Sequence, residues 1–300
     1  MKATAQTLTA APVIEKTWFA VISDLIKARL TFLVLLTTFV GFYAGNVGPM
    51  DWAKLLNTVL GTFLVASGAA ALNQLMEREF YAKMRRTEDR PLPSGRMQPE
   101  TVLILGGVSG AIGLVYLAMA VNLTTSLLGA ITLGSYLFIY TPLKRVTTLN
   151  TLVGAVPGAL PPMMGWVAAR GQMGQGGWAL FAILFFWQLP HFLAIAWIYK
   201  DEYSRAGFVM LPSVDPDGGR TGRQAVSHAL GLLPVSLSPF LLGYTGRIYL
   251  FGAFFLGLAY CWRAFQFSRY LTIPHARRLF FMSIIYLPLL LGLMVFDKIK

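Results

Sequence analysis

One polar segment interrupts a largely apolar sequence and contains most of the residues with potential for chemistry. Asn73, Glu77 and Tyr81 are spaced four residues apart, so in a helix they lie on one face. Glu79 adds a second carboxylate, and amide and carboxylate oxygens are ligands that Mg²⁺ accepts. The segment also carries six basic residues: Arg78, Lys83, Arg85, Arg86, Arg90 and Arg96. Oxygen ligands beside basic side chains predict a site for a magnesium-bridged phosphate ester.

A second acidic segment follows another apolar stretch further along the chain. Asp201 and Glu202 lie there, with Lys200 and Arg205 on either side. If both segments meet at one cavity, their carboxylates can hold Mg²⁺ on two sides of a diphosphate. The alternative is that both are ordinary solvated loops. Basic residues are normal on the cytoplasmic side of membrane proteins, and exposed ion pairs contribute little.

Two further groups of polar residues lie in or beside apolar stretches. Lys144 and Arg145 are predicted to donate to phosphate oxygens or, alternatively, to be ordinary basic flanks of a membrane span. Gln188 and His191 lie inside an apolar stretch, next to Trp187, where polar groups are costly without a role. We expect His191 to contact a substrate, as a ligand to haem iron or a hydrogen-bond partner, unless it merely bonds a neighbouring carbonyl.

The composition limits the class of protein that positions these residues. Hydrophobic residues make up 56% of the 300 residues, and the mean hydropathy is +0.60. These values exclude an ordinary soluble domain and indicate an integral membrane protein. The net charge of +12 would favour nucleic acid as a partner of a soluble protein, but here it reports on topology. The single cysteine, Cys261, excludes an intramolecular disulfide and a cysteine-based metal cluster, and we expect no removable signal peptide.

Nine apolar stretches are long enough to cross a bilayer as helices, and no strand pattern competes with them. They are residues 30–47, 55–76, 101–122, 123–141, 151–169, 178–198, 225–243, 248–265 and 279–296. Prolines inside several stretches and small residues before Asn73 favour a bundle around a central cavity. The polar segments follow the second and sixth stretches. We therefore expect an all-α polytopic membrane bundle of nine transmembrane helices, two four-helix units plus one.

The basic residues also predict the orientation of the chain. When the spans alternate across the membrane, twenty of the 25 Lys and Arg residues fall on one side and five on the other. Basic residues collect on the cytoplasmic side. The N-terminus, including a tail of residues 1–29, and both polar segments are therefore expected in the cytoplasm. The C-terminus is expected outside, and the membrane to be a bacterial-type cytoplasmic membrane.

Several stretches together resemble the protohaem IX farnesyltransferase branch of the UbiA-type intramembrane prenyltransferases, over nearly the whole chain. Residues 73–81 are similar to the superfamily's diphosphate site, and residues 86–95 match the family's signature loop. Residues 144–166 and 187–192 are the parts most particular to the haem branch. The resemblance implies that residues 30–300 form a single UbiA-like transmembrane prenyltransferase domain.

The resemblance implies an Mg²⁺-dependent transfer of a farnesyl group from farnesyl diphosphate to a vinyl group of haem b, with addition of water, giving haem O and diphosphate. The implied catalytic residues are Asn73, Glu77, Lys144 and Asp201. The implied metal ligands are Asn73, Glu77, Glu79, Asp201 and Glu202. Diphosphate would be bound by Lys83, Arg86, Arg90, Arg145 and Lys200, and haem by Trp187, Gln188 and His191. The implied partners are the lipid bilayer and a downstream haem A synthase or terminal oxidase, with no nucleic acid.

The chain departs from the family's pattern at two positions. Tyr81 stands where the family usually has an aspartate, and a phenol is a poor Mg²⁺ ligand at neutral pH. We therefore expect Glu79 to substitute, or one metal to bind more weakly. Lys27-Ala28-Arg29 lacks the proline usual between the basic residues. Two alternatives stay open: a UbiA-type prenyltransferase for a quinone-type aromatic acceptor, and a non-catalytic haem-handling or transport membrane protein.

Overall fold

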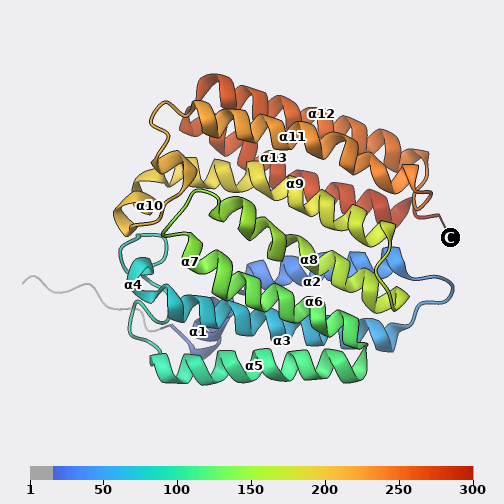
Figure 1. Cartoon of the computed structure of the whole chain (residues 1–300), viewed down its shortest axis with the longest axis horizontal. Coiled ribbons are helices and arrows are strands. Elements are labelled where there is room, and N and C mark those ends of the chain that lie inside the picture. Colours follow the sequence, from blue (N-terminus) through green and yellow to red (C-terminus); the bar gives the residue numbers. More distant parts are fainter. Residues whose placement is uncertain (1–15, 300) are drawn as a thin grey trace, which may run out of the picture.

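The computed structural model describes residues 16–299, and the predicted all-α fold is confirmed there. Figure 1 shows the long helices lying side by side. The long helical segments are α2 (Ala28–Gly45), α3 (Trp52–Met76), α5 (Pro99–Ala120), a fourth made of α6 (Leu123–Gly134), the π-helix η1 (Ser135–Tyr140) and α7 (Thr141–Leu143), then α8 (Asn150–Arg170), α9 (Gln175–Ile198), α11 (Gly219–Leu241), α12 (Arg247–Tyr270) and α13 (Ile273–Phe296). Within the described range, eight of these segments are long and apolar enough to span a bilayer, and α11 is the exception.

The start of α11 differs from the predicted span. The helix begins at Gly219, before the predicted range 225–243, and its first turns carry Arg220 and Arg223. These residues lower its mean hydropathy. A helix can continue beyond the hydrocarbon region because its backbone is internally hydrogen-bonded and its basic side chains can reach water. The predicted helix is therefore present, and its boundary was wrong by about two turns at 3.6 residues per turn.

Short helices and caps connect the long ones. Asp51 caps α3, because the backbone N–H of Lys54 donates to Asp51 Oδ1 at 2.9 Å. The predicted tail, residues 1–29, contains a short helix, and its residues 1–15 lie outside the described part. The remaining short elements are α1 (Trp18–Leu25), α4 (Arg78–Tyr81), α10 (Lys200–Ala206) and the 3₁₀ turn η2 (Leu211–Ser213).

Two helix pairs pack closely through glycine. A Cβ on Gly41 of α2 would lie 1.9 Å from the carbonyl oxygen of Pro162 in α8. A Cβ on Gly165 of α8 would lie 2.0 Å from the carbonyl oxygen of Thr38 in α2. A Cβ on Gly68 of α3 would lie 2.6 Å from the carbonyl oxygen of Gly106 in α5, a close approach expected from the small residues before Asn73. α8 is the most buried of the candidate spans, and its three prolines face protein rather than lipid.

Both polar segments lie at the same end of the bundle, which we call the polar end (Figure 1). The first runs from α3 through α4 to α5, and the second from α9 through α10 and η2 to α11. Phe80 of α4 packs against Phe208, with ring centroids 5.4 Å apart, and Tyr203 contacts the same ring at 6.1 Å. Buried apolar side chains of both segments form one cluster with these rings. The two segments therefore contact each other through these rings, and the shared cavity for their carboxylates stays a prediction.

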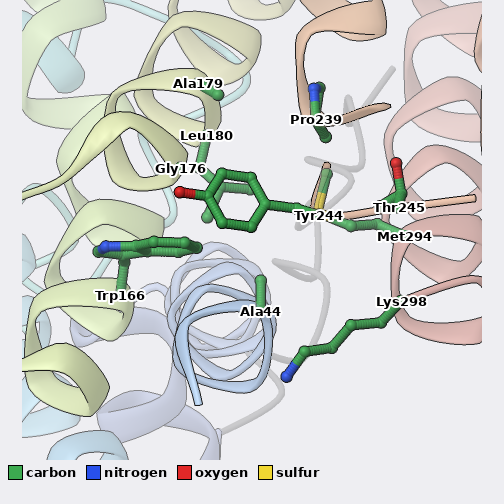
Figure 2. A pocket seen from close by; sticks show the side chains of 10 residues that line it. All are labelled: Ala44, Trp166, Gly176, Ala179, Leu180, Pro239, Tyr244, Thr245, Met294 and Lys298. Carbon is green, nitrogen blue, oxygen red and sulfur yellow. The ribbon is translucent and has the colours of Figure 1, made fainter. Parts of the chain in front are cut away.

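A small apolar pocket lies at the opposite end of the bundle (Figure 2). The indole of Trp166 packs edge-on against Tyr244 there, with ring centroids 5.1 Å apart. Lys298 lies beside the pocket, and its Nζ donates to the carbonyl oxygens of Tyr43 and Asn46, both at 2.7 Å. This pocket is separate from the polar segments. The larger cavity expected beneath those segments stays a prediction.

Candidate active site

The centre of the polar end is an ion pair between two spans. Glu77 follows α3 and is fully buried. Lys144 follows α7, and its Nζ lies 3.0 Å from Glu77 Oε1 and 2.9 Å from Glu77 Oε2. Because both side chains are buried, solvent screens their attraction little. Two of the predicted catalytic residues are thus in direct contact.

Asn73 and Tyr81 bond the same carboxylate, one helical turn before and after Glu77. Asn73 Nδ2 donates to Glu77 Oε2 at 2.9 Å, and the Tyr81 hydroxyl donates to the same oxygen at 2.6 Å. The Tyr81 hydroxyl also lies 3.0 Å from Asn73 Oδ1. The predicted common face is therefore confirmed. Tyr81, at the position where the family usually has an aspartate, acts as a hydrogen-bond donor to Glu77.

Lys27 is a site residue that the sequence analysis did not assign. Its Nζ donates to Asn73 Oδ1 at 2.7 Å and lies 3.4 Å from the hydroxyl of Tyr136. Its backbone adopts the left-handed conformation, with φ 51°, immediately before α2. Few residues other than glycine adopt a positive φ. The available signal was the pair of basic residues at Lys27 and Arg29, directly before the first span.

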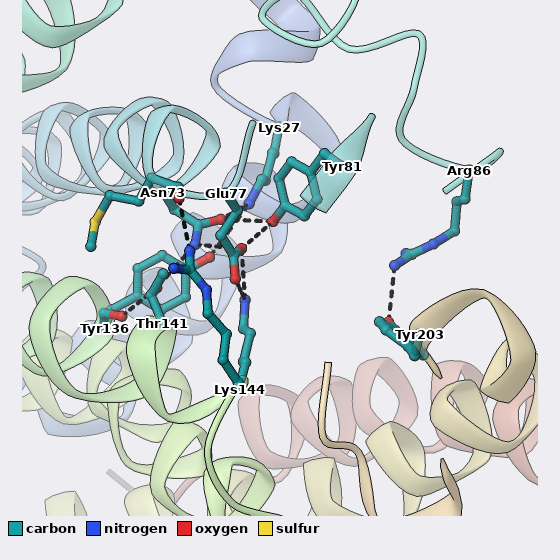
Figure 3. Close-up of polar contacts among 11 residues, drawn as sticks. Lys27, Asn73, Glu77, Tyr81, Arg86, Tyr136, Thr141, Lys144 and Tyr203 are labelled. Atoms are coloured by element: carbon teal, nitrogen blue, oxygen red, sulfur yellow. Dashed lines mark hydrogen bonds and ion pairs between the residues drawn. The ribbon is translucent and has the colours of Figure 1, made fainter. Parts of the chain in front are cut away.

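The fourth span contributes to the site through its π-helical stretch, η1. Stretches of this kind often occur at functional positions. Thr141 follows it, and its Oγ1 accepts from Asn73 Nδ2 at 3.0 Å and donates to the carbonyl oxygen of Tyr136 at 2.8 Å. The ring centroid of Tyr140 lies 4.5 Å from the Nζ of Lys144. Figure 3 shows how side chains from several helices converge on the one carboxylate of Glu77.

The cluster holds more basic than acidic groups. Burial opposes ionisation of Glu77, but the charge of Lys144 and the hydrogen bond from Tyr81 keep the pKa of this carboxyl below its usual value. Burial, with the charges of Arg90 and Lys144, places the pKa of Lys27 well below its usual value. Burial and the neighbouring Glu77 raise the pKa of Tyr81 well above its usual value. Tyr81 is therefore a neutral donor at neutral pH.

Arg90 adds an unpaired donor beside this cluster. The centre of its guanidinium lies 4.4 Å from the ring centroid of Tyr81. Its Nη1 is buried and has no hydrogen-bond partner among the described residues. A buried donor without a partner costs about 1–3 kcal/mol. An anionic ligand that supplied an acceptor at this atom would remove that cost.

The second acidic segment contacts the first through Arg86. Arg86 Nη2 donates to the hydroxyl of Tyr203 at 2.9 Å, and its backbone N–H donates to Glu202 Oε2 at 3.4 Å. Figure 3 shows the bond between Arg86 and Tyr203 apart from the cluster at Glu77. Asp201 is exposed. Among the described residues, Arg86 thus adds hydrogen bonds to the ring contacts between the segments, and the carboxylates of Glu77 and Asp201 do not share a partner.

The expected metal ligands are not gathered into one cage. In the part of the chain that the structure describes, no three His, Cys, Asp or Glu side chains are grouped so as to hold a metal ion. Glu79 is exposed, whereas Asn73 and Glu77 are buried side by side. Mg²⁺ at phosphate sites commonly uses one or two protein carboxylates and takes its other ligands from substrate phosphates and water. Asn73 and Glu77 match that smaller donor set by type, although in this structure their oxygens accept hydrogen bonds from Lys27, Lys144 and Tyr81.

The other predicted diphosphate ligands lie outside the cluster at Glu77. Arg145 Nη2 donates to the carbonyl oxygen of Met76 at 2.9 Å, at the end of α3 where positive charge is favourable. Lys83 is exposed, and the Nζ of Lys200 lies 4.9 Å from the ring centroid of Trp197. Arg145 therefore bonds a helix end, Lys83 lies in the turn after α4, and Lys200 is the first residue of α10.

The three expected haem contacts, all in α9, have different neighbours. Gln188 is buried, and its Nε2 donates to the carbonyl oxygen of Ala155 in α8 at 2.7 Å. Trp187 Nε1 donates to the carbonyl oxygen of Ser283 in α13 at 2.9 Å, and His191 Nδ1 lies 2.7 Å from Ser283 Oγ. Gln188 thus joins α9 to α8, while Trp187 and His191 both bond α13.

Solved structures share this helical fold. A structure described as digeranylgeranylglyceryl phosphate synthase has a TM-score of 0.79 at 15% identity, over 93% of this chain and 98% of the other. A UbiA homologue from Archaeoglobus fulgidus bound to GPP and Mg²⁺ has a TM-score of 0.65 at 15% identity, over 91% of this chain and 99% of the other. Residues 34–285 match the model of the UbiA prenyltransferase family, so the chain belongs to this family.

Within the family, the chain is similar to proteins named protoheme IX farnesyltransferase. It is 48% identical to the one from Solibacter usitatus, over 92% of this chain and 97% of the relative. It is 44% identical to the one from Salinibacter ruber, over 91% of this chain and 96% of the relative. These matches extend over nearly the whole chain and confirm the resemblance found in the sequence.

Proposed function

We propose that this protein transfers the farnesyl group of farnesyl diphosphate to a vinyl group of haem b, with addition of water, to give haem O and diphosphate. The name shared by its relatives, at 48% and 43% identity, supports this pair of substrates. The observation that carries the proposal is the cluster of Lys27, Glu77 and Lys144 beside the unpaired Nη1 of Arg90.

Lys27, Lys144 and Arg90 are the proposed contacts of the departing diphosphate. Cleavage of the allylic C–O bond places positive charge on the farnesyl carbon and negative charge on diphosphate. Fixed cations stabilise that negative charge more in the transition state than in the bound substrate. Glu77 holds the ammonium of Lys144, and Asn73 holds that of Lys27. The two donors are therefore positioned before the substrate arrives.

Asn73 and Glu77 are the proposed protein ligands of Mg²⁺ in the first polar segment. Their oxygens suit a magnesium ion that also binds diphosphate. The UbiA homologue with bound GPP and Mg²⁺ supports a metal in this fold. When bound, Mg²⁺ would neutralise negative charge on the leaving diphosphate. Asp201 and Glu202 are the proposed ligands of Mg²⁺ from the second segment. The backbone N–H of Arg86 in the first segment already donates to Glu202.

The polar end also contains apolar side chains that can exclude bulk water. Phe80, Met84 and Phe208 belong to the apolar cluster between the two polar segments. An allylic cation reacts with any water that reaches it, so the site must exclude bulk solvent. The rings of Tyr136 and Tyr140, whose centroids are 5.7 Å apart beside the cluster, offer aromatic faces that could stabilise the cation.

The acceptor is proposed to contact α9. His191 and Trp187 carry groups suited to haem: an imidazole and a large aromatic face. Gln188 is proposed to hold α9 against α8, since its amide already bonds Ala155. Residues 30–300 are proposed to form one domain, which is supported by the family match over residues 34–285. The N-terminus is proposed to lie on the cytoplasmic side, which is supported by the unequal distribution of the 25 basic residues.

The decisive experiment is mass spectrometry of haems from membranes that contain the full chain, supplied with farnesyl diphosphate and haem b. Formation of haem O together with release of diphosphate is expected. Lys144→Met should abolish most of this conversion, while an exposed basic residue outside the site, Arg29→Gln, should not change it. Prenylation of a quinone-type acceptor in place of haem would favour the alternative enzyme. Consumption of neither substrate would favour a non-catalytic role.

A further inference from the structure

Ser283 of α13 contacts the imidazole of His191 and is fully buried. Its Oγ is 2.7 Å from His191 Nδ1, and its carbonyl oxygen accepts from Trp187 Nε1 at 2.9 Å. One residue of α13 therefore fixes two aromatic side chains of α9. None of the sequence patterns had drawn attention to it.

The hydroxyl of Ser283 identifies which nitrogen of His191 carries a proton. Ser283 Oγ donates to the carbonyl oxygen of Phe280 at 2.5 Å. Two oxygens this close must share a hydrogen atom, and a serine hydroxyl has only one. Ser283 Oγ therefore accepts from His191 Nδ1, which must carry the N–H. A neutral imidazole has one ring proton, so its Nε2 presents a lone pair.

The orientation of the imidazole is also fixed by aromatic contacts. Its ring stacks on Trp187, with centroids 5.2 Å apart and planes inclined by 21°. It also stacks on Phe280, at 5.0 Å and 27°. With Nδ1 bonded to Ser283 and the ring held by two neighbours, Nε2 is the nitrogen left for a ligand.

We propose that Ser283 is a positioning residue that sets the tautomer and direction of His191, so that His191 Nε2 binds the iron of haem b. This inference rests on the proposed function, in which haem b is the acceptor. A histidine that binds a metal usually donates its other ring N–H to a carbonyl, carboxylate or similar acceptor. Loss of such a partner typically weakens binding by 10–100-fold. The carbonyl of Phe280 would thus act on His191 through the Ser283 hydroxyl.

The test is titration of the purified full chain with haem b in the absence of farnesyl diphosphate. Binding is measured by absorption spectroscopy, and ligation by the iron–histidine stretch in resonance Raman spectra of the ferrous form. The wild type is expected to show histidine ligation, and His191→Ala to lose it. Ser283→Ala should bind haem b about tenfold more weakly and shift the iron–histidine stretch. Ser283→Thr, which keeps the hydroxyl, should restore both.

A second buried serine supplies the matched control. Ser236 of α11 bonds the hydroxyl of Tyr286 at 2.6 Å and is also fully buried. Ser236→Ala should leave the haem spectrum unchanged, because it loses a buried hydroxyl away from His191. If Ser283→Ala does not fold, Ser283→Cys and Ser283→Thr carry the test, since a thiol is a weaker acceptor than a hydroxyl.

The outcomes separate this inference from the function on which it rests. If His191→Ala loses ligation while Ser283→Ala, or Ser283→Cys, matches the wild type, the role of Ser283 is overturned and haem binding stands. If His191→Ala also keeps the wild-type spectrum, His191 is not the ligand and the inference fails. If the wild type does not bind haem b at all, the proposed acceptor is wrong.

Discussion

Lys144 bonds both carboxylate oxygens of Glu77, and the two residues follow different spans, 67 positions apart in the sequence. Both side chains are buried, so each charge depends on the other for its stabilisation. This pair therefore joins the end of α3 to the end of the fourth span. It also places an ammonium group beside the oxygens proposed to bind a metal.

Removal of one partner of this pair should destabilise the fold more than removal of both partners. Glu77→Gln and Lys144→Met should each lower the free energy of unfolding by about 3–5 kcal/mol, because an uncompensated charge is left buried. The double variant should be more stable than the sum of the single effects indicates. Thermal unfolding in detergent measures this coupling. Additive effects on the free energy of unfolding would mean that the pair is not coupled. All three variants should also lose haem O formation.

Tyr81→Asp should strengthen the binding of divalent metal ions. The substitution replaces a neutral donor with a carboxylate next to Glu77, and carboxylates are the ligands that Mg²⁺ prefers. Binding of Mn²⁺, followed by electron paramagnetic resonance, should occur at lower concentration than in the wild type. Tyr81→Phe is the control, since it loses the hydroxyl without adding a ligand. Equal Mn²⁺ affinity in Tyr81→Asp and Tyr81→Phe would contradict a metal site beside position 81.

Lys27→Met should weaken the use of farnesyl diphosphate. Its ammonium is held by Asn73 at 2.7 Å, and a hydrogen bond to a charged group contributes about 1.5–3 kcal/mol. The KM for farnesyl diphosphate should rise about tenfold or more. Lys54→Met provides the control, because Lys54 lies at the other end of α3. An unchanged KM in Lys27→Met would remove this residue from the diphosphate site.

Arg86→Gln should loosen the contact between the two polar segments. The substitution removes the bond to the Tyr203 hydroxyl and the contact with the Tyr199 ring, whose centroid lies 5.3 Å from the guanidinium. Hydrogen exchange should increase in residues 84–96 and 200–214. The neighbouring Arg85 is exposed, so Arg85→Gln serves as the control. Equal exchange in the two variants would show that Arg86 does not hold the segments together.

Lys298→Ala should destabilise the end of the bundle opposite the polar segments. The Nζ of Lys298 caps α2 by donating to the carbonyl oxygens of Tyr43 and Asn46 (Figure 2 shows Lys298 beside the pocket). Positive charge at a helix C-terminus stabilises by up to about 1 kcal/mol in most sites. A lower midpoint of thermal unfolding is expected, with haem O formation retained at low temperature. Lys298→Arg should retain most of the stability, and a result equal to alanine would contradict the cap.

The sequence alone was sufficient for the features that depend on local periodicity. Long apolar stretches predicted the helices, because only a helix satisfies its own backbone in hydrocarbon. The spacing of Asn73, Glu77 and Tyr81 predicted their common face, because residues four apart are neighbours on a helix. Apolarity alone did not locate the start of α11, since its first turns carry the basic residues Arg220 and Arg223.

Only the tertiary structure decided which distant residues complete the site. Lys27 lies 46 positions from Asn73 and Ser283 lies 92 from His191, and no periodicity links residues on separate spans. Their contacts depend on how closely the helices pack, which is set by small residues such as Gly41 against Pro162. Helix–helix packing therefore determined that the side-chain amines of Lys27 and Lys144 gather at Asn73 and Glu77, the two residues expected to bind a metal.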